Sequence, residues 1–319
     1  YPPPFLVAVL PLALLPYGWA LAAWVAATFA LWWATIRPLL PERWAILPLL
    51  AFPAVFVNAS HGQNGFLTAA LLGAAALSLG RRPVLAGLCI GLLAIKPHLG
   101  LAIPVALLAA RRWTAFWAAS AGVVLAGLVA LAVFGTGAWQ AFLANAALAR
   151  EVMEAGLVAP EKMVSVFAAV RVLGGDPALA YAVQAVVAIG VLVLLERWLR
   201  RRPGGVAEIA AVAAATPLVS PFLLDYDLVV LGLPMAFVLG AALRGGGFLP
   251  WEKLVLLAAF VLPLASRGIG TGFGVPVAPL VTAALLWVVA RRLALMRGGA
   301  VAPARAAPPG GAFPWEPLR

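Results

Sequence analysis

The stretch "LLAIKPHLGL", residues 92–101, places Lys96, Pro97 and His98 inside an apolar segment. A cation and an imidazole are costly at membrane depth, so they usually face a cavity and mark a functional site. A tight turn at the membrane surface would accommodate them as well. Proline disfavours helical backbone at the preceding residue, so the triplet predicts a break between two short helices, 83–95 and 98–110.

The composition around this stretch indicates a helical membrane protein. Hydrophobic residues make up 65% of the 319 residues and charged residues 10%, and the mean hydropathy is +1.05. Apolar runs recur along nearly the whole chain, which excludes an ordinary soluble domain. The alternating pattern of an outer-membrane barrel is absent. The single cysteine, Cys89, excludes a disulfide framework and a cysteine-based metal site.

The apolar runs predict an all-α, polytopic bundle of about eleven transmembrane helices. We expect them at 17–36, 44–57, 65–79, 83–95, 98–110, 113–134, 178–196, 206–222, 226–243, 251–266 and 275–290. Residues 4–15 are too short to cross and are bounded by prolines, which predicts a re-entrant segment. Two amphipathic helices, "NAALAREVMEAG" (145–156) and "EKMVSVFAAVRVLGG" (161–175), are expected at the extracytoplasmic surface.

These elements form one predicted membrane domain, residues 1–296. The tail 297–319 is rich in Pro, Ala and Gly, and we expect it to be disordered and cytoplasmic. The chain begins with "YPPPF" and without Met, so we interpret it as a fragment that lacks its natural N-terminus.

The net charge of +11 reflects sidedness and needs no nucleic-acid partner. When the loops are assigned alternately to two sides, most of the 22 basic residues fall on one side. The positive-inside rule places that side in the cytoplasm. We expect the protein to lie in the plasma (inner) membrane, with its active face extracytoplasmic. Both arginine pairs, 81–82 and 111–112, are cytoplasmic only if the Lys-Pro-His triplet is an outer turn. The basic residues left on the outer side are Lys96, Arg150, Lys162, Arg171 and Arg267.

The uncharged polar residues gather on the same outer side. They lie in three turns, "NASHGQNG" (58–65), "SPFLLDYDL" (220–228) and "ASRGIGTGFG" (265–274). The cytoplasmic loops are short and hold no Gly-rich phosphate-binding loop. An enzyme or carrier with its polar groups outside fits a lipid-borne substrate better than a cytoplasmic nucleotide.

The outer turns supply the candidate substrate-binding residues. Lys96 is either an interfacial anchor or a ligand for a lipid phosphate. His61 and His98 have no Cys or carboxylate at ligand spacing, which favours hydrogen bonding over a metal site. Gln63 and Asn64 lie between two glycines and can contact a sugar or cap a helix.

The remaining candidates are charged. Asp225 and Asp227 are two residues apart and diverge by about 200° on a helix, so a paired-carboxylate dyad is not expected. One can cap the following helix while the other faces the cavity. Arg267, at an outer helix end, can hold a phosphate or pair with an aspartate.

Several of these motifs occur in a characteristic order. They are "YPPPFLVAVLPLALLPYGWALAAW", "SHGQNGFLTAALL", "GLLAIKPHLGLAIPVALLAARRW", "KMVSVFAAVRVLGG" and "SPFLLDYDLVVLGLP". Over roughly residues 1–290 the chain resembles glycosyltransferase family 87, integral-membrane enzymes of the GT-C type related to polyprenol-phosphate-mannose-dependent mannosyltransferases.

The resemblance implies inverting transfer of a hexose, often mannose, from a polyprenyl-phosphate donor to an extracytoplasmic lipid or glycan acceptor, with no metal or other cofactor. Lys96 would then hold the donor phosphate, and His61, Gln63 and Asn64 would line the sugar site. The general base of GT-C enzymes is typically an aspartate in the first outer loop, which would precede Tyr1 here. Asp225, Asp227 and Glu154 are the fallback bases.

Two other classes of protein share parts of this pattern. A secondary transporter or flippase also has short helices broken by Gly and Pro, with polar residues at the breaks. No internal repeat relates two halves of this chain, and the polar residues lie at one face rather than at the midplane. A non-catalytic membrane assembly subunit would scatter the outer polar clusters instead of bringing them together.

Overall fold

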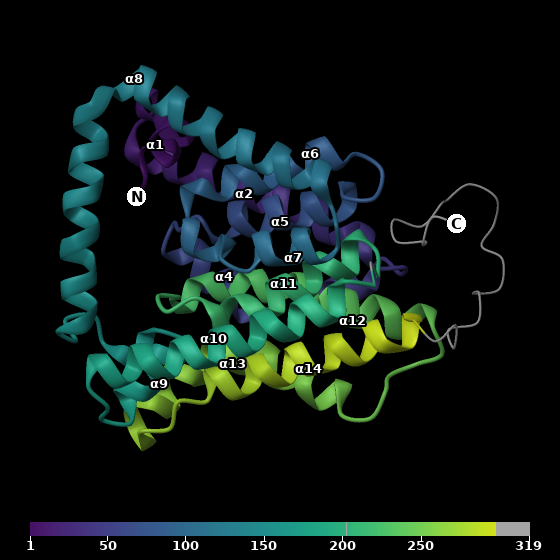
Figure 1. Ribbon diagram of the computed structural model, residues 1–319. Helices are drawn as coiled ribbons and strands as arrows, with labels where there is room; N and C mark the ends of the chain where they lie inside the picture. The colour runs from purple at the N-terminus through teal and green to yellow at the C-terminus, as the bar shows by residue number, and fades with distance from the viewer. Residues whose placement is uncertain (202, 298–319) are drawn as a thin grey trace.

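The computed structural model describes residues 1–201 and 203–297 (Figure 1). The described residues form an all-α protein, in which the only β-type pairing is an isolated bridge between Met163 and Leu224. The predicted tail, 297–319, lies outside the described residues apart from residue 297.

The helical elements follow one another along the chain without a sheet between them. They are α1 (Pro3–Val9), η1 (Leu10–Leu14), α2 (Tyr17–Ile36), η2 (Arg37–Leu39), η3 (Trp44–Ile46), α3 (Leu47–Leu50), α4 (Pro53–Ser60), α5 (Gly65–Ser78), α6 (Pro83–Gly91), η4 (Leu92–Ile95), η5 (Pro97–Gly100), α7 (Ile103–Ala109), α8 (Trp113–Glu154), η6 (Pro160–Lys162), α9 (Val166–Val172), α10 (Pro177–Leu199), α11 (Gly205–Val219), η7 (Asp225–Leu231), α12 (Gly232–Arg244), α13 (Glu252–Phe273) and α14 (Ala278–Arg297).

Six segments in the described part of the chain are long and apolar enough to cross a membrane. They are Tyr17–Leu39, Trp113–Glu154, Pro177–Leu199, Asp225–Arg244, Glu252–Phe273 and Ala278–Met296. Shorter apolar helices, among them α5 and α11, pack between them, and every residue of α11 is buried. The chain is therefore a polytopic, all-α membrane protein, as its composition predicts.

The prediction of one helix over 44–57 is wrong. These residues divide into η3, α3 and α4, with the break at Ala51 and Phe52. Phe52 has ψ 120° because it precedes Pro53, whose ring disfavours helical backbone at the residue before it.

The predicted break at the Lys-Pro-His triplet is confirmed. Lys96 has φ −148° and ψ 71°, which separates η4 from η5. The chain therefore reverses at this point, and α6 and α7 are two short helices rather than one long helix.

Close packing of glycines fixes α6 against α8. A Cβ on Gly87 would lie 2.4 Å from the carbonyl oxygen of Ala115, and a Cβ on Gly91 would lie 2.6 Å from that of Ala119. Contacts that advance together along both helices mean that α6 and α8 run parallel. This small-residue spacing lets two membrane helices approach at backbone distance.

Gly91→Ala is expected to lower the free energy of unfolding by about 1–3 kcal/mol, because the added methyl group meets the backbone of α8 and forces the two helices apart. Thermal unfolding in detergent measures the effect. Gly190→Ala is the matched control, since a Cβ there meets nothing within 4 Å. Equal melting temperatures for the two variants would contradict the packing argument.

The helix α8 bends sharply at Gly135, which has φ 71° and ψ −177°. The first part of α8 crosses the bundle beside α6, and the part after Gly135 turns down one side of the molecule toward α9 and α10 (Figure 1). The predicted helix 113–134 ends at this bend. The predicted amphipathic helix 145–156 is the last part of α8 and not a separate element.

The second predicted amphipathic helix, 161–175, is also not continuous. It divides into η6 and α9, with extended backbone between them. There the backbone N–H of Val164 donates to the carbonyl of Leu223 at 2.9 Å. This outer segment is thereby joined to the loop that precedes η7.

Arginines gather at one end of the bundle, which we call the arginine end. Because α6 and α8 are parallel, their N-cap residues, Arg82 and Arg112, share this end. Arg112 binds both carboxylate oxygens of Glu208, at 3.1 and 2.7 Å. Arg292 binds both carboxylate oxygens of buried Glu252. The arrangement agrees with the prediction that both arginine pairs lie on a single side.

Candidate functional site

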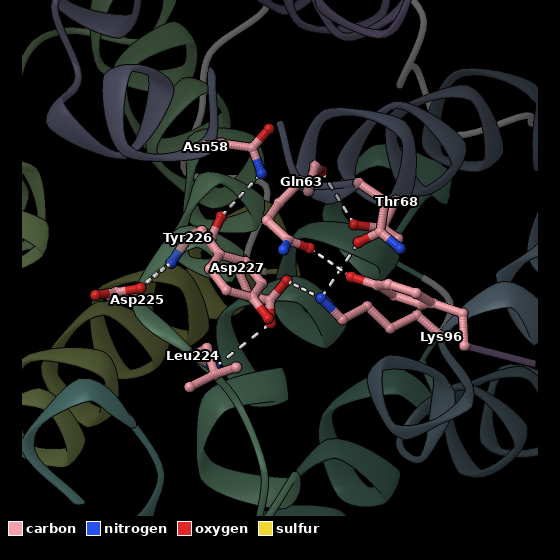
Figure 2. Close-up of polar contacts among 11 residues, drawn as sticks. Asn58, Gln63, Thr68, Lys96, Leu224, Asp225, Tyr226 and Asp227 are labelled. Carbon is pink, nitrogen blue, oxygen red and sulfur yellow. Dashed lines mark hydrogen bonds and ion pairs between the residues drawn. The ribbon is translucent and has the colours of Figure 1, made fainter. Parts of the chain in front are cut away.

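The opposite end of the bundle holds a buried ion pair between Lys96 and Asp227 (Figure 2). Lys96 is 5% exposed and Asp227 is 2% exposed. The Lys96 Nζ donates to Oδ1 of Asp227 and, at 3.3 Å, to Oδ1 of Asn64. The same ammonium lies 4.8 Å from the ring centroid of Tyr226. We call this end of the bundle the lysine end.

Three chain breaks bring these groups together. Lys96 stands at the reversal between η4 and η5, and Asn64 precedes the first residue of α5 after a turn in which Gly62 has φ 59°. Asp227 lies in the first turn of η7, where its Oδ2 accepts from the backbone N–H of Leu224 at 3.4 Å. The cluster therefore joins the N-terminal and C-terminal halves of the chain.

A second layer of contacts supports the ion pair. The Asn58 side-chain amide donates to the carbonyl of Tyr226 at 3.3 Å. A Cβ on Gly65 would lie 2.3 Å from Asn58 Nδ2 and 2.8 Å from that carbonyl, so only glycine fits between these groups. The turn 58–65 is thus packed directly against the η7 loop.

Gln63 lies at the edge of the cluster and accepts a hydrogen bond from the hydroxyl of Tyr1. Partial burial, and secondarily the charge of Asp227, raise the pKa of Tyr1 above its ordinary value. Tyr1 therefore remains a protonated donor at neutral pH.

The two histidines both lie near the cluster but differ in their contacts. His61 is exposed, its Nδ1 is 2.8 Å from the carbonyl of Val57, and its ring centroid is 6.1 Å from that of Tyr226. His98 is half-buried, and its Nε2 is buried without a hydrogen-bond partner. The structure thus places His61 beside Tyr226, and His98 in η5 directly after the chain reversal at Lys96.

Asp225 and Asp227 point in different directions, as their spacing predicts (Figure 2). Asp225 Oδ1 accepts from the backbone N–H of Tyr226 at 2.8 Å, and the ion pair to Lys96 is made by Asp227 alone. The two carboxylates do not form a dyad. Asp227 serves both as the helix cap, through Leu224, and as the partner of the predicted cation.

Two candidates make no contact with the cluster. Glu154 binds Arg150 at 2.6 Å and the hydroxyl of Tyr181 at 2.8 Å. Arg267 is exposed on α13. Glu154 is therefore engaged elsewhere in the fold, and Arg267 lies on the surface.

Sequence patterns missed three contributors: Tyr226, Asn58 and Tyr1. Tyr226 stands between the two aspartates in "LDYDL", and an aromatic ring beside a buried cation is the signal that could have identified it. Asn58 lies in the predicted outer turn 58–65, where no pattern distinguishes it from its neighbours. Its contact with Tyr226 spans 168 positions and has no local signal.

Several polar atoms at the lysine end are buried without a partner. Buried polar groups are nearly always hydrogen-bonded, so such atoms indicate a place for water or a ligand. Within the described residues they include Asn58 Oδ1, Asn64 Nδ2, His98 Nε2 and Ser220 Oγ. An ammonium next to unused amide and imidazole groups can bind an oxyanion and hydroxyl groups.

Comparison with family models identifies the family of this chain. The model of glycosyltransferase family 87 matches residues 1–221, which include Asn58, Asn64, Lys96 and His98 and end before Asp225. No curated protein and no solved structure matches the chain.

Proposed function

Because the chain belongs to glycosyltransferase family 87, we propose that it transfers a hexose, with mannose the first choice, from a polyprenyl-phosphate-linked donor. The acceptor is an extracytoplasmic lipid or glycan, and the sugar carbon inverts. The protein works in the plasma membrane with the lysine end outside. The observation that carries the proposal is the buried Lys96 ammonium beside the unpartnered Asn64 and His98 groups.

The proposed reaction breaks the bond between the sugar C1 and the phosphate oxygen. The acceptor hydroxyl attacks C1 from the face opposite the phosphate, loses its proton to a base, and the bonding electrons leave with polyprenyl phosphate. Lys96 stabilises the negative charge that builds up on the departing phosphate. A lipid monophosphate with this support needs no metal, so the proposal includes no cofactor.

His61, Gln63 and Asn64 are assigned to the sugar, since they lie in one turn beside Lys96 and carry donors and acceptors. Three carboxylates are candidates for the general base. Asp227 forms an ion pair with Lys96, and Glu154 binds Arg150 and the hydroxyl of Tyr181. Asp225 is the one whose carboxylate is bound only by a backbone N–H. Its role is tested by replacing it with Asn.

The test uses the complete protein in nanodiscs with radiolabelled polyprenyl-phosphate-mannose and an extracted lipid pool. Wild type is expected to bind the donor and to transfer label. Lys96→Ala is expected to lower donor affinity and kcat/KM by about 100-fold or more, because it removes a charge-assisted contact to phosphate in a water-poor site.

Lys253→Ala is the matched control, since Lys253 is exposed and lies at the start of α13, near the arginine end. It is expected to behave as wild type. Folded wild-type protein that binds no donor would refute the proposal. Donor movement across the bilayer without transfer would support the carrier instead.

A further inference from the structure

Lys96 already has a counter-ion in this structure, although the proposed function requires it to meet a phosphate. Its ammonium is buried and contacts Asp227, Asn64 and the face of Tyr226 (Figure 2). Two of its three N–H donors are used by oxygen acceptors. A phosphate can accept from the third N–H donor as the site stands, but it can accept from a second one only if one of the two oxygens gives way.

The pair differs in kind from the other buried ion pairs of the described chain. Glu208 and Glu252, at the arginine end, are each bound by two nitrogens of one guanidinium. Such a planar, two-bond pair has a fixed geometry, whereas a lysine ammonium is a point charge whose partner can be exchanged. A buried ion pair contributes little net stability compared with apolar residues of the same size, so stability alone does not account for this one.

The amide of Asn64 gives independent support for an anion at this position. An ammonium can only donate, so the amide oxygen of Asn64 accepts from Lys96, and the nitrogen of the same amide group is left as an unused donor. That nitrogen is buried and has no acceptor, and Asn64 itself is 1% exposed. An N–H group needs an acceptor, and an oxyanion held by Lys96 would supply one.

We propose that Asp227 is a displaceable counter-ion: it neutralises Lys96 in the empty site and yields the ammonium to the donor phosphate. The identity of that phosphate rests on the proposed function. Asp227 thereby lowers the affinity for polyprenyl phosphate. When the product leaves, the carboxylate returns to Lys96 and promotes release. Asp227 is a positioning residue that acts through Lys96.

The decisive variant is Asp227→Asn, which keeps the size of the side chain and an oxygen that can accept from Leu224 and Lys96. It removes both the competing anion and its repulsion of the phosphate. Its Kd for polyprenyl-phosphate-mannose, measured in nanodiscs without acceptor, is expected to be about tenfold lower than that of wild type. A structural residue would show the same Kd or a higher one.

Asp176→Asn is the matched control, since it removes a carboxylate that accepts from the backbone N–H of Leu179 and does not contact Lys96. Equal tightening in both variants would show a general effect of charge and would overturn the inference. Unchanged or weaker binding by folded Asp227→Asn would overturn it as well. If the wild type binds donor and Lys96→Ala does not, the proposed function stands in either case. If neither the wild type nor any variant binds the donor, the proposed function is refuted, and with it the inference that rests on it.

A measurement on the wild type covers the case in which Asp227→Asn does not fold. The sequence has three aspartates, Asp176, Asp225 and Asp227, so ¹³C-labelled carboxylate signals are few. Addition of polyprenyl phosphate is expected to shift the Asp227 signal and to leave that of Asp176 in place. An Asp227 signal that does not move when the donor is bound would overturn the inference.

Discussion

Asp227→Ala is expected to lower the free energy of unfolding by about 3–5 kcal/mol, and Lys96→Met combined with Asp227→Leu is expected to recover most of that loss. The single substitution leaves the 5% exposed ammonium of Lys96 without its carboxylate. An unpaired buried charge destabilises the fold by far more than the ion pair stabilises it. Replacing both residues with apolar ones of similar size leaves no buried charge, so this cost does not arise. Denaturant unfolding in mixed micelles measures all three proteins.

The same double variant separates stability from function. It is expected to unfold like wild type and to show no donor binding, since the phosphate has lost its cation. A double variant as unstable as Asp227→Ala would mean that other contacts of these residues, to Asn64 or Leu224, dominate. A double variant that still binds the donor would remove Lys96 from the proposed site.

Arg292→Met is expected to lower the free energy of unfolding by a similar amount, about 3–5 kcal/mol, without changing the affinity for the donor. It leaves Glu252, which is 0% exposed, with none of the guanidinium bonds it has now. It also removes the hydrogen bond at 2.8 Å from Arg292 to the carbonyl of Gly247, which holds the turn between α12 and α13. Unfolding in mixed micelles and donor titration are measured on the same preparation.

Arg197→Met serves as the control, because Arg197 is exposed in the last turn of α10. Its expected cost is below about 0.5 kcal/mol. If Arg292→Met weakened donor binding as strongly as Lys96→Ala, the two ends of the bundle would be energetically coupled. The separate roles assigned to the arginine end and the lysine end would then be wrong.

Local sequence was sufficient for the features that depend on neighbouring residues. Pro97 disfavours helical backbone at Lys96, so the reversal between α6 and α7 could be predicted and is confirmed. The spacing of Asp225 and Asp227 predicted that they diverge, which the structure shows. Apolar runs are also a local feature of the sequence, and they predicted most of the long helices.

The contacts that define the site could not be predicted in this way. Lys96 and Asp227 are 131 positions apart. No local pattern indicates that Lys96, the residue predicted to bind a phosphate, is paired with the carboxylate of Asp227. The end of the predicted helix at 134 coincides with the bend at Gly135, but the continuation of α8 beyond it to Glu154 could not be predicted. In each case the packing of distant helices decides the outcome, and a window of a few residues does not contain that information.

The long sequence separation within the ion pair also constrains the biosynthesis of the protein. The hairpin that carries Lys96 leaves the ribosome and reaches the translocon well before Asp227 has been synthesised. During that interval the ammonium has no counter-ion. Because Lys96 lies at a chain reversal rather than in mid-helix, its ammonium can remain hydrated at the membrane surface during that interval. Burial of the ammonium beside its counter-ion therefore has to follow the synthesis of η7, which brings both the carboxylate and the Tyr226 ring.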